Sequence, residues 1–284
     1  MFENIFKGFS FIKESFSLIM KDADVIKPSF YSIFAGAFFT ILSVIIMFLL
    51  QSGLGSGIFY LFALLILLGN YFISYFFTGM TAFLVYDYFK DGDATMSEAW
   101  AATKKNTMTI FYLAIISAVV NIILGILRGR TRRDRSVAGG LSGMIIGFIE
   151  KAWTVATYFM IPAIVIEDRD LKGAVERASS IIKNNLLPIG VGEIAVGLVT
   201  GFLSVIGFVI AIVIGISLAT VITPLIAILV AAILIVIVIA LSMYVTTAYH
   251  TCLFLWARNV EGSKAGVSGT IKPPAPIAGA LGIA

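Results

Sequence analysis

Residues Ala138 to Asp168 read AGGLSGMIIGFIEKAWTVATYFMIPAIVIED, an apolar stretch with two charged residues, Glu150 and Lys151, near its middle. An apolar run of this length can cross a bilayer as a helix. An ionisable side chain at the centre of such a helix costs about 2.5 to 3.5 kcal/mol on insertion scales, so residues of this kind usually serve a function. The stretch therefore predicts a membrane span with a polar site inside it.

The composition of the whole chain also indicates a membrane protein. Of the 284 residues, 60% are hydrophobic and 13% are charged, and the mean hydropathy is +1.03. A water-soluble domain of this length could not bury so much apolar surface, so a bilayer must cover it. The single cysteine, Cys252, excludes an internal disulfide and a cysteine-based metal cluster.

The order of apolar and charged segments predicts an all-α polytopic membrane bundle, built as three units that each contain an amphipathic helix and a helical hairpin. The amphipathic segments have apolar residues at steps of three and four. The unit is echoed in SFSLIMKDADVIKPSF, SEAWAATKKNTMTIF and AVERASSIIKNNLLPI. The predicted parts are an interfacial helix at 1–27, a six-span membrane domain at 28–258, spans at about 28–50, 57–89, 107–127, 138–166, 187–214 and 221–257, amphipathic helices at about 97–105 and 171–184, and a flexible tail at 259–284.

Basic residues predict the orientation. Because each unit holds two spans, the three amphipathic helices and both termini are expected on one membrane face. That face carries fourteen Lys and Arg residues and is therefore predicted to be cytoplasmic, in the plasma membrane. Five arginines fall on the opposite face, where they could contact anionic lipid headgroups, bind an acidic partner or form a solvated loop; they are Arg128, Arg130, Arg132, Arg133 and Arg135.

Small residues predict where helices approach one another closely. Glycines recur at every fourth residue in two spans, at Gly139, Gly143 and Gly147 and again at Gly197 and Gly201. Such spacing lets two helix backbones pack against each other in a membrane.

The candidate polar site consists of Glu150, Lys151 and Glu193. Adjacent residues on a helix point about 100° apart, so Glu150 and Lys151 need different partners. Lys151 could approach Glu193, although the two lie at different depths, about 22 Å and 9 Å from the cytoplasmic ends of their spans. A second geometry makes 138–149 a separate interfacial helix, and we favour the continuous span. The only histidine, His250, is expected at the membrane interface rather than in a proton relay.

Several stretches resemble a widespread prokaryotic family of six-span membrane proteins of uncharacterised function. They are KGFSFIKESF near the start, AWTVATYFMIP at 152–162 with the following Glu167 and AVERASSI, and LFLWARNVEG near the end. The chain departs from the family pattern at Glu150, at Lys151 and in the arginine-rich loop. Its topology also looks like the membrane domain sometimes fused to glycerophosphodiester phosphodiesterases, but the chain has no room for their catalytic barrel.

The sequence indicates no catalytic chemistry. It contains no Walker-type loop, no His/Glu metal helix, no Ser-centred elbow and no Cys/His pair, so we expect no enzyme, no cofactor, no metal and no nucleic-acid partner.

Two hypotheses remain. The favoured one is an assembly or scaffold subunit that forms a homo-oligomer or joins a larger membrane complex, because packing motifs outnumber polar ones. The alternative is a channel or transporter for an ion or small solute that uses Glu150, Lys151 and Glu193.

Overall fold

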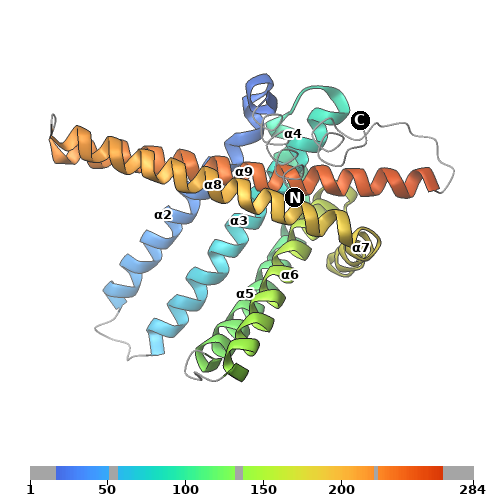
Figure 1. Ribbon diagram of the computed structural model, residues 1–284, viewed down its shortest axis with the longest axis horizontal. Coiled ribbons are helices and arrows are strands. Elements are labelled where there is room, and N and C mark those ends of the chain that lie inside the picture. Colours follow the sequence, from blue (N-terminus) through green and yellow to red (C-terminus); the bar gives the residue numbers. More distant parts are fainter. Residues whose placement is uncertain (1–16, 51–56, 132–136, 221–222, 265–284) are drawn as a thin grey trace.

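The computed structural model describes residues 17–50, 57–131, 137–220 and 223–264, and this part of the chain is almost entirely helical, with no strand (Figure 1). Six of its helices are long and apolar enough to cross a membrane. The prediction of an all-α, six-span membrane protein is therefore confirmed. The six are α2 (Lys27–Leu50), α3 (Gly57–Asp91), α5 (Thr107–Thr131), α6 (Val137–Glu167), α8 (Leu186–Ala219) and α9 (Pro224–Lys264).

Short helices precede each hairpin, as the three-unit pattern predicts. The turn η1 (Ala23–Ile26) leads into α2, α4 (Met96–Lys105) leads into α5, and α7 (Leu171–Asn184) leads into α8. The helix α7 is amphipathic and buries Ala174, Ala178 and Ile181. Segment 1–16 and tail 265–284, where an interfacial helix and a flexible tail were predicted, lie outside the described residues.

Carboxylates join these short helices to the spans. Asp22 accepts a hydrogen bond from the backbone N–H of Ala94 at 2.7 Å, and Asp87 accepts one from Thr95 at 3.0 Å, so the link before α4 is fixed to η1 and α3. Glu167 at the end of α6 lies 3.2 Å from Nε of Arg177 on α7. Charge-assisted bonds of this kind are stronger than neutral ones, and here they order one end of the molecule.

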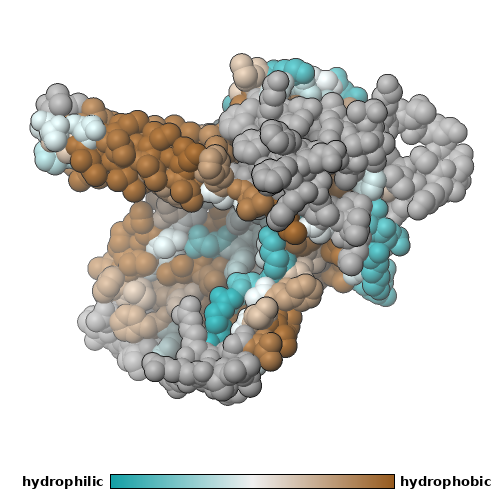
Figure 2. Space-filling view, viewed as in Figure 1, coloured by the Kyte–Doolittle hydropathy of each residue, from teal (hydrophilic) through white to brown (hydrophobic). Residues whose placement is uncertain are grey.

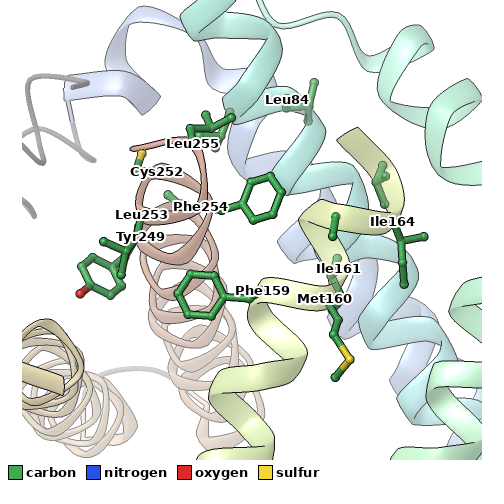
Figure 3. Close-up of a cluster of buried hydrophobic side chains, with 14 of the residues drawn as sticks. Leu84, Phe159, Met160, Ile161, Ile164, Tyr249, Cys252, Leu253, Phe254 and Leu255 are labelled. Carbon is green, nitrogen blue, oxygen red and sulfur yellow. The ribbon is translucent and has the colours of Figure 1, made fainter. Parts of the chain in front are cut away.

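The spans do not all run side by side. Figure 1 shows α2, α3, α5 and α6 extending in one direction while the α8–α9 pair lies across them. Only the second half of α9 packs on this bundle, where Tyr244 and Phe254 are fully buried. In Figure 3, Phe254 of α9 and Phe159 of α6 point toward each other's helices. The other half of the pair projects beyond the bundle as an arm with an apolar surface (Figure 2).

The helix α6 is continuous from Val137 to Glu167 and includes Pro162. The structure thus has the continuous span and not a separate helix at 138–149. Asp168 ends the helix in the left-handed region, with φ 53°. The N–H of Arg169 returns to the carbonyl of Ala163 at 3.2 Å, so the turn after the helix satisfies one of its last carbonyls.

Glycines pack helices closely at positions other than those predicted. On α8, a Cβ added at Gly207 would lie 2.5 Å from Val238 of α9. By contrast, a Cβ added at Gly147, Gly197 or Gly201 would meet no atom of the described residues within 4 Å, so these three glycines contact no helix in that part of the chain. Gly143 is half-buried, and the surroundings of Gly139 lie outside the described residues.

A leucine at Gly207 should weaken the α8–α9 pair. Its side chain would overlap Val238, and overpacking of this kind typically costs about 1 to 3 kcal/mol. We expect Gly207→Leu to lower the melting temperature in detergent, measured by tryptophan fluorescence. Gly201→Leu is the matched control on the same helix and should melt like the wild type. Equal losses in the two variants would contradict the observed packing.

The carboxylate of Asp168 should make stability depend on pH. Hydrogen bonds from Lys105 and Asn106 hold the pKa of Asp168 below its ordinary value of 3.8. A lowered pKa in the folded state adds stability above pH about 4, and this contribution is lost as the pH falls through the folded-state pKa. Because the ion pair is exposed, we expect Asp168→Asn to cost less than about 1 kcal/mol at pH 7.

Asparagine tolerates the left-handed backbone at position 168, so the variant isolates the charge. Melting temperatures of both proteins between pH 2 and pH 7 should differ most near neutrality and converge in acid. A difference that persists unchanged at pH 2 would show that the carboxylate charge is not the cause.

Candidate functional site

A cavity of ≈ 270 Å³ lies between α3, α5 and α6, and almost all of its walls are polar or aromatic. The three helices are among those apolar enough to span a membrane, so these polar groups lie within otherwise apolar segments. In Figure 2, hydrophilic surface fills the hollow beneath the projecting arm, between apolar helices. The lining residues are Tyr71, Ser74, Tyr75 and Thr78 of α3, Asn121 of α5, and Glu150, Trp153, Thr154, Thr157, Tyr158 and Ile161 of α6.

The spacing of the lining residues explains why they face one cavity. On both α3 and α6 they recur at steps of three and four, which places them on a single face of each helix. Sequence analysis weighed only the charged members of this set. The signal that could have revealed the rest is a stripe of hydroxyl and aromatic residues at helical spacing within an apolar span.

Glu150 faces this cavity and forms an ion pair with Arg128 of α5. Arg128 was predicted to follow the span and to contact anionic lipid headgroups, an acidic partner or solvent. It lies instead in the last turns of α5, beside the cavity. The side chain of Arg130 lies outside the described residues, as do Arg132, Arg133 and Arg135 entirely. Of the five arginines, the structure therefore places one, and it places that one beside Glu150.

Lys151 and Glu193 lie on the other side of α6, where α8 and α9 cross it. Nζ of Lys151 is 3.1 Å from Oε2 of Glu193. The difference in depth that argued against this pair does not apply, because α8 crosses α6 instead of running antiparallel beside it (Figure 1). Glu150 does not join them, since adjacent side chains on one helix diverge.

His250 completes the second cluster. Its side chain is 3% exposed, and its Nε2 contacts Oε1 of Glu193. The interfacial depth expected for it stays a prediction. Nδ1 lies 2.7 Å from the carbonyl of Thr246. Because this carbonyl can only accept, Nδ1 carries a proton, and one further proton between Nε2 and Oε1 completes the contact with Glu193. We call Lys151, Glu193 and His250 the charged triad.

Tyr158 connects the charged triad with the cavity. It belongs to the cavity lining, and its ring stacks on His250 with 4.3 Å between the ring centroids and 12° between the ring planes. Four residues further along α6, Pro162 has no N–H to donate to the carbonyl of Tyr158. Tyr158 thus contacts both the cavity and the charged triad. Its backbone carbonyl lacks the N–H donor that a helix normally supplies.

Among the described residues, no group of three or more His, Cys, Asp or Glu side chains could hold a metal ion. The triad has only two groups that bind metals, Glu193 and His250, and Lys151 adds a positive charge beside them. Cys252, two residues beyond His250, is buried. The chemistry that the arrangement offers is the binding and exchange of protons and polar solutes.

The triad should depend more on its anion than on its lysine. Glu193→Gln removes the carboxylate that both Lys151 and His250 contact, and removing one partner of a buried ion pair costs about 3 kcal/mol. Lys151→Met should cost less than about 1 kcal/mol, because the lysine is 61% exposed and Glu193 keeps His250. Thermal denaturation in detergent measures both, with Glu176→Gln on the exposed face of α7 as the control. A larger loss for Lys151→Met would contradict this ranking.

No curated protein and no solved structure matches the chain. A family of unknown function, DUF6159, matches residues 56–264, which include every helix from α3 to α9. The match covers the residues that line the cavity and all three members of the charged triad. With six helices able to span a membrane, the chain is a multi-pass membrane protein that belongs to the DUF6159 family of unknown function.

Proposed function

We propose that this protein binds a small polar solute or ion inside the membrane and passes it across, as a channel or transporter. The observation that carries the proposal is the cavity between α3, α5 and α6 with its polar walls. Among soluble and membrane proteins alike, a concave site with a few convergent polar groups is the usual place for a ligand. The preference for a scaffold that sequence analysis favoured is reversed for this reason.

The cost of the polar walls supports a role in binding. In membrane proteins, polar side chains on spans either hydrogen-bond neighbouring helices or face a polar site, and those that line the cavity face one shared space. Burying such groups costs free energy unless each finds a partner. A bound polar solute would supply partners to the groups that face the cavity.

The charged triad supports transport over static binding. A histidine and a carboxylate in contact can pass a proton between them, and ionisable groups of this kind mark proton and ion pathways in membrane proteins. Tyr158 places the triad next to the cavity, with its ring on His250. Solute binding and proton exchange would therefore occur at neighbouring positions on α6.

We include in the proposal that the protein catalyses no covalent reaction. A histidine that activates a nucleophile needs a free ring nitrogen within hydrogen-bond reach of the attacking group. Both ring nitrogens of His250 are occupied, one by Thr246 and the other by Glu193. The same residue is the only histidine of the chain.

The orientation and location also belong to the proposal. Basic residues gather at the end of the molecule where the short helices lie, among them Lys105, Lys172 and Arg177. By the positive-inside rule this end faces the cytoplasm, with both termini, in the plasma membrane of a prokaryote. Anionic lipid around the arginines, and the likeness to the membrane domain of glycerophosphodiester phosphodiesterases, stay predictions.

Transport can be tested by the re-swelling of proteoliposomes after an osmotic shock, followed by light scattering. The four probes are glycerol, potassium chloride, choline chloride and sodium glutamate. We expect at least one to enter faster than into protein-free liposomes. Ser74→Phe, which would fill the cavity, should abolish that gain, whereas Val205→Phe on an exposed face of α8 should not. No gain with any probe, or a gain that survives Ser74→Phe, would contradict the proposal.

A second candidate is an assembly subunit, favoured by the arm of α8 and α9. Its exposed apolar surface extends beyond the bundle (Figure 2). Nearer the bundle on α8, Gly197 and Gly201 also face open space. Another copy of the chain or another membrane subunit could pack a helix there, although lipid could cover the same surface.

Assembly predicts a change in particle mass. Native mass spectrometry of Gly197→Leu/Gly201→Leu in detergent should show a smaller oligomer than the wild type, with an unchanged melting temperature. A wild-type protein that is already a monomer in mild detergent and in lipid discs would argue against this candidate.

A further inference from the structure

We propose that the cavity between α3, α5 and α6 binds an organic cation with an ammonium head group. This inference deepens the proposed function and rests on it for the location of the site. Its support is independent, because it comes from the kinds of atoms that face the cavity: aromatic rings, oxygen acceptors and one carboxylate.

Aromatic rings form two walls of the cavity. Tyr71 and Tyr75 of α3 lie with 5.6 Å between their ring centroids and 49° between their planes, and Trp153 and Tyr158 contribute the rings of α6. The face of an aromatic ring is electronegative and attracts cations, most strongly in the case of tryptophan. Several such rings around one space are the usual means of recognising quaternary ammonium groups.

Four side chains of the lining already donate a hydrogen bond within the protein. The hydroxyls of Thr154 and Thr157 donate to backbone carbonyls one turn earlier, each at 2.9 Å. The indole N–H of Trp153 donates to Oγ of Ser117 at 3.2 Å, and the amide of Asn121 donates to the carbonyl of Ser117 at 3.0 Å.

Groups that have given up their donors offer a ligand only acceptors, namely the lone pairs of hydroxyl and amide oxygens. A cavity rich in acceptors favours a ligand that is positively charged and disfavours an anion.

Glu150 supplies the negative charge. Among the described residues that line the cavity, it is the only charged one. Its ion pair is with Arg128, a residue that does not belong to the lining. An ionised carboxylate accepts several hydrogen bonds or cationic contacts, so the side of Glu150 that faces the cavity can hold an ammonium group. Lys151 does not compete, since it points to Glu193.

The size of the cavity limits the ligand. At ≈ 270 Å³ it is at or below the lower end of ligand pockets, which span about 300 to 1,000 Å³. A head group the size of choline fits this limit. Such a group could belong to a free solute or to a lipid, and the experiment must separate the two sources.

Isothermal titration calorimetry can test the inference with protein in nanodiscs of phosphatidylglycerol, a lipid without an ammonium group. The probes are choline and its uncharged isostere 3,3-dimethyl-1-butanol. We expect choline to bind at least tenfold more tightly than the isostere. Equal affinities, or no heat with choline, would overturn the proposal.

Variants assign the binding to the cavity. Glu150→Gln/Arg128→Met removes both charges of the pair, so neither is left without its partner, and it should weaken choline binding at least tenfold. Tyr71→Leu should weaken it as well, while Glu176→Gln on α7 should leave it unchanged. Full choline affinity in the double variant and in Tyr71→Leu, with melting temperatures near that of the wild type, would place the site elsewhere and overturn the proposal.

Discs of phosphatidylcholine distinguish the source of the ligand. If the lipid head group occupies the cavity, choline should no longer bind there, and if the ligand is a free solute, its affinity should be the same in both discs. Either outcome supports an ammonium site. Choline binding without any solute flux would support this inference and count against transport, whereas flux of glycerol without choline binding would count against this inference alone.

Discussion

A polar side chain in the hydrocarbon region must find its partner inside the protein, and this constraint decides how α6 meets its neighbours. Its two adjacent charges diverge around the helix, so Glu150 pairs with α5 while Lys151 pairs with α8. Trp153 adds a hydrogen bond to Ser117 of α5. In lipid, apolar surface gives little drive for helices to associate. Polar pairs and close packing therefore determine which helices meet. The polar groups of α6 thus hold it to α5 on one side and to α8 on the other.

The other end of the molecule follows the rules of water-exposed protein. There the carboxylates of Asp22, Asp87 and Glu167 cap loops or bind arginines. Arg177 also lies 5.7 Å from the centroid of the Phe254 ring, so its side chain ties α7 to α9 as well as to α6. These contacts fix where each hairpin begins. The position of the cavity is thus set from two sides, by this anchored end and by the polar pairs within the spans.

The helices could be predicted from sequence because length and hydropathy determine them almost alone. The prediction of six spans in three units holds for this reason, and so does the continuity of α6 through Glu150 and Lys151. The crossing of α8 and α9 could not be predicted, since a uniformly apolar helix does not specify which neighbour it meets. The glycine motifs show this limit: Gly197 and Gly201 have the spacing of a contact and face open space, whereas Gly207 makes the contact. The contact of His250 with Glu193 could not be predicted, because this partner, 57 residues earlier in the sequence, lies beside it only through that crossing.

The crossing also leaves one half of α9 outside the bundle. It is a single helix of 41 residues, about 60 Å long, and only its second half is held in the bundle. His250 lies within the held half, against Tyr158 and Glu193. A stiff rod fixed at one place transmits a small rotation there as a large displacement at its free end. A change in the contacts of one buried imidazole would therefore be amplified along the arm, far from the cavity beside which it occurs.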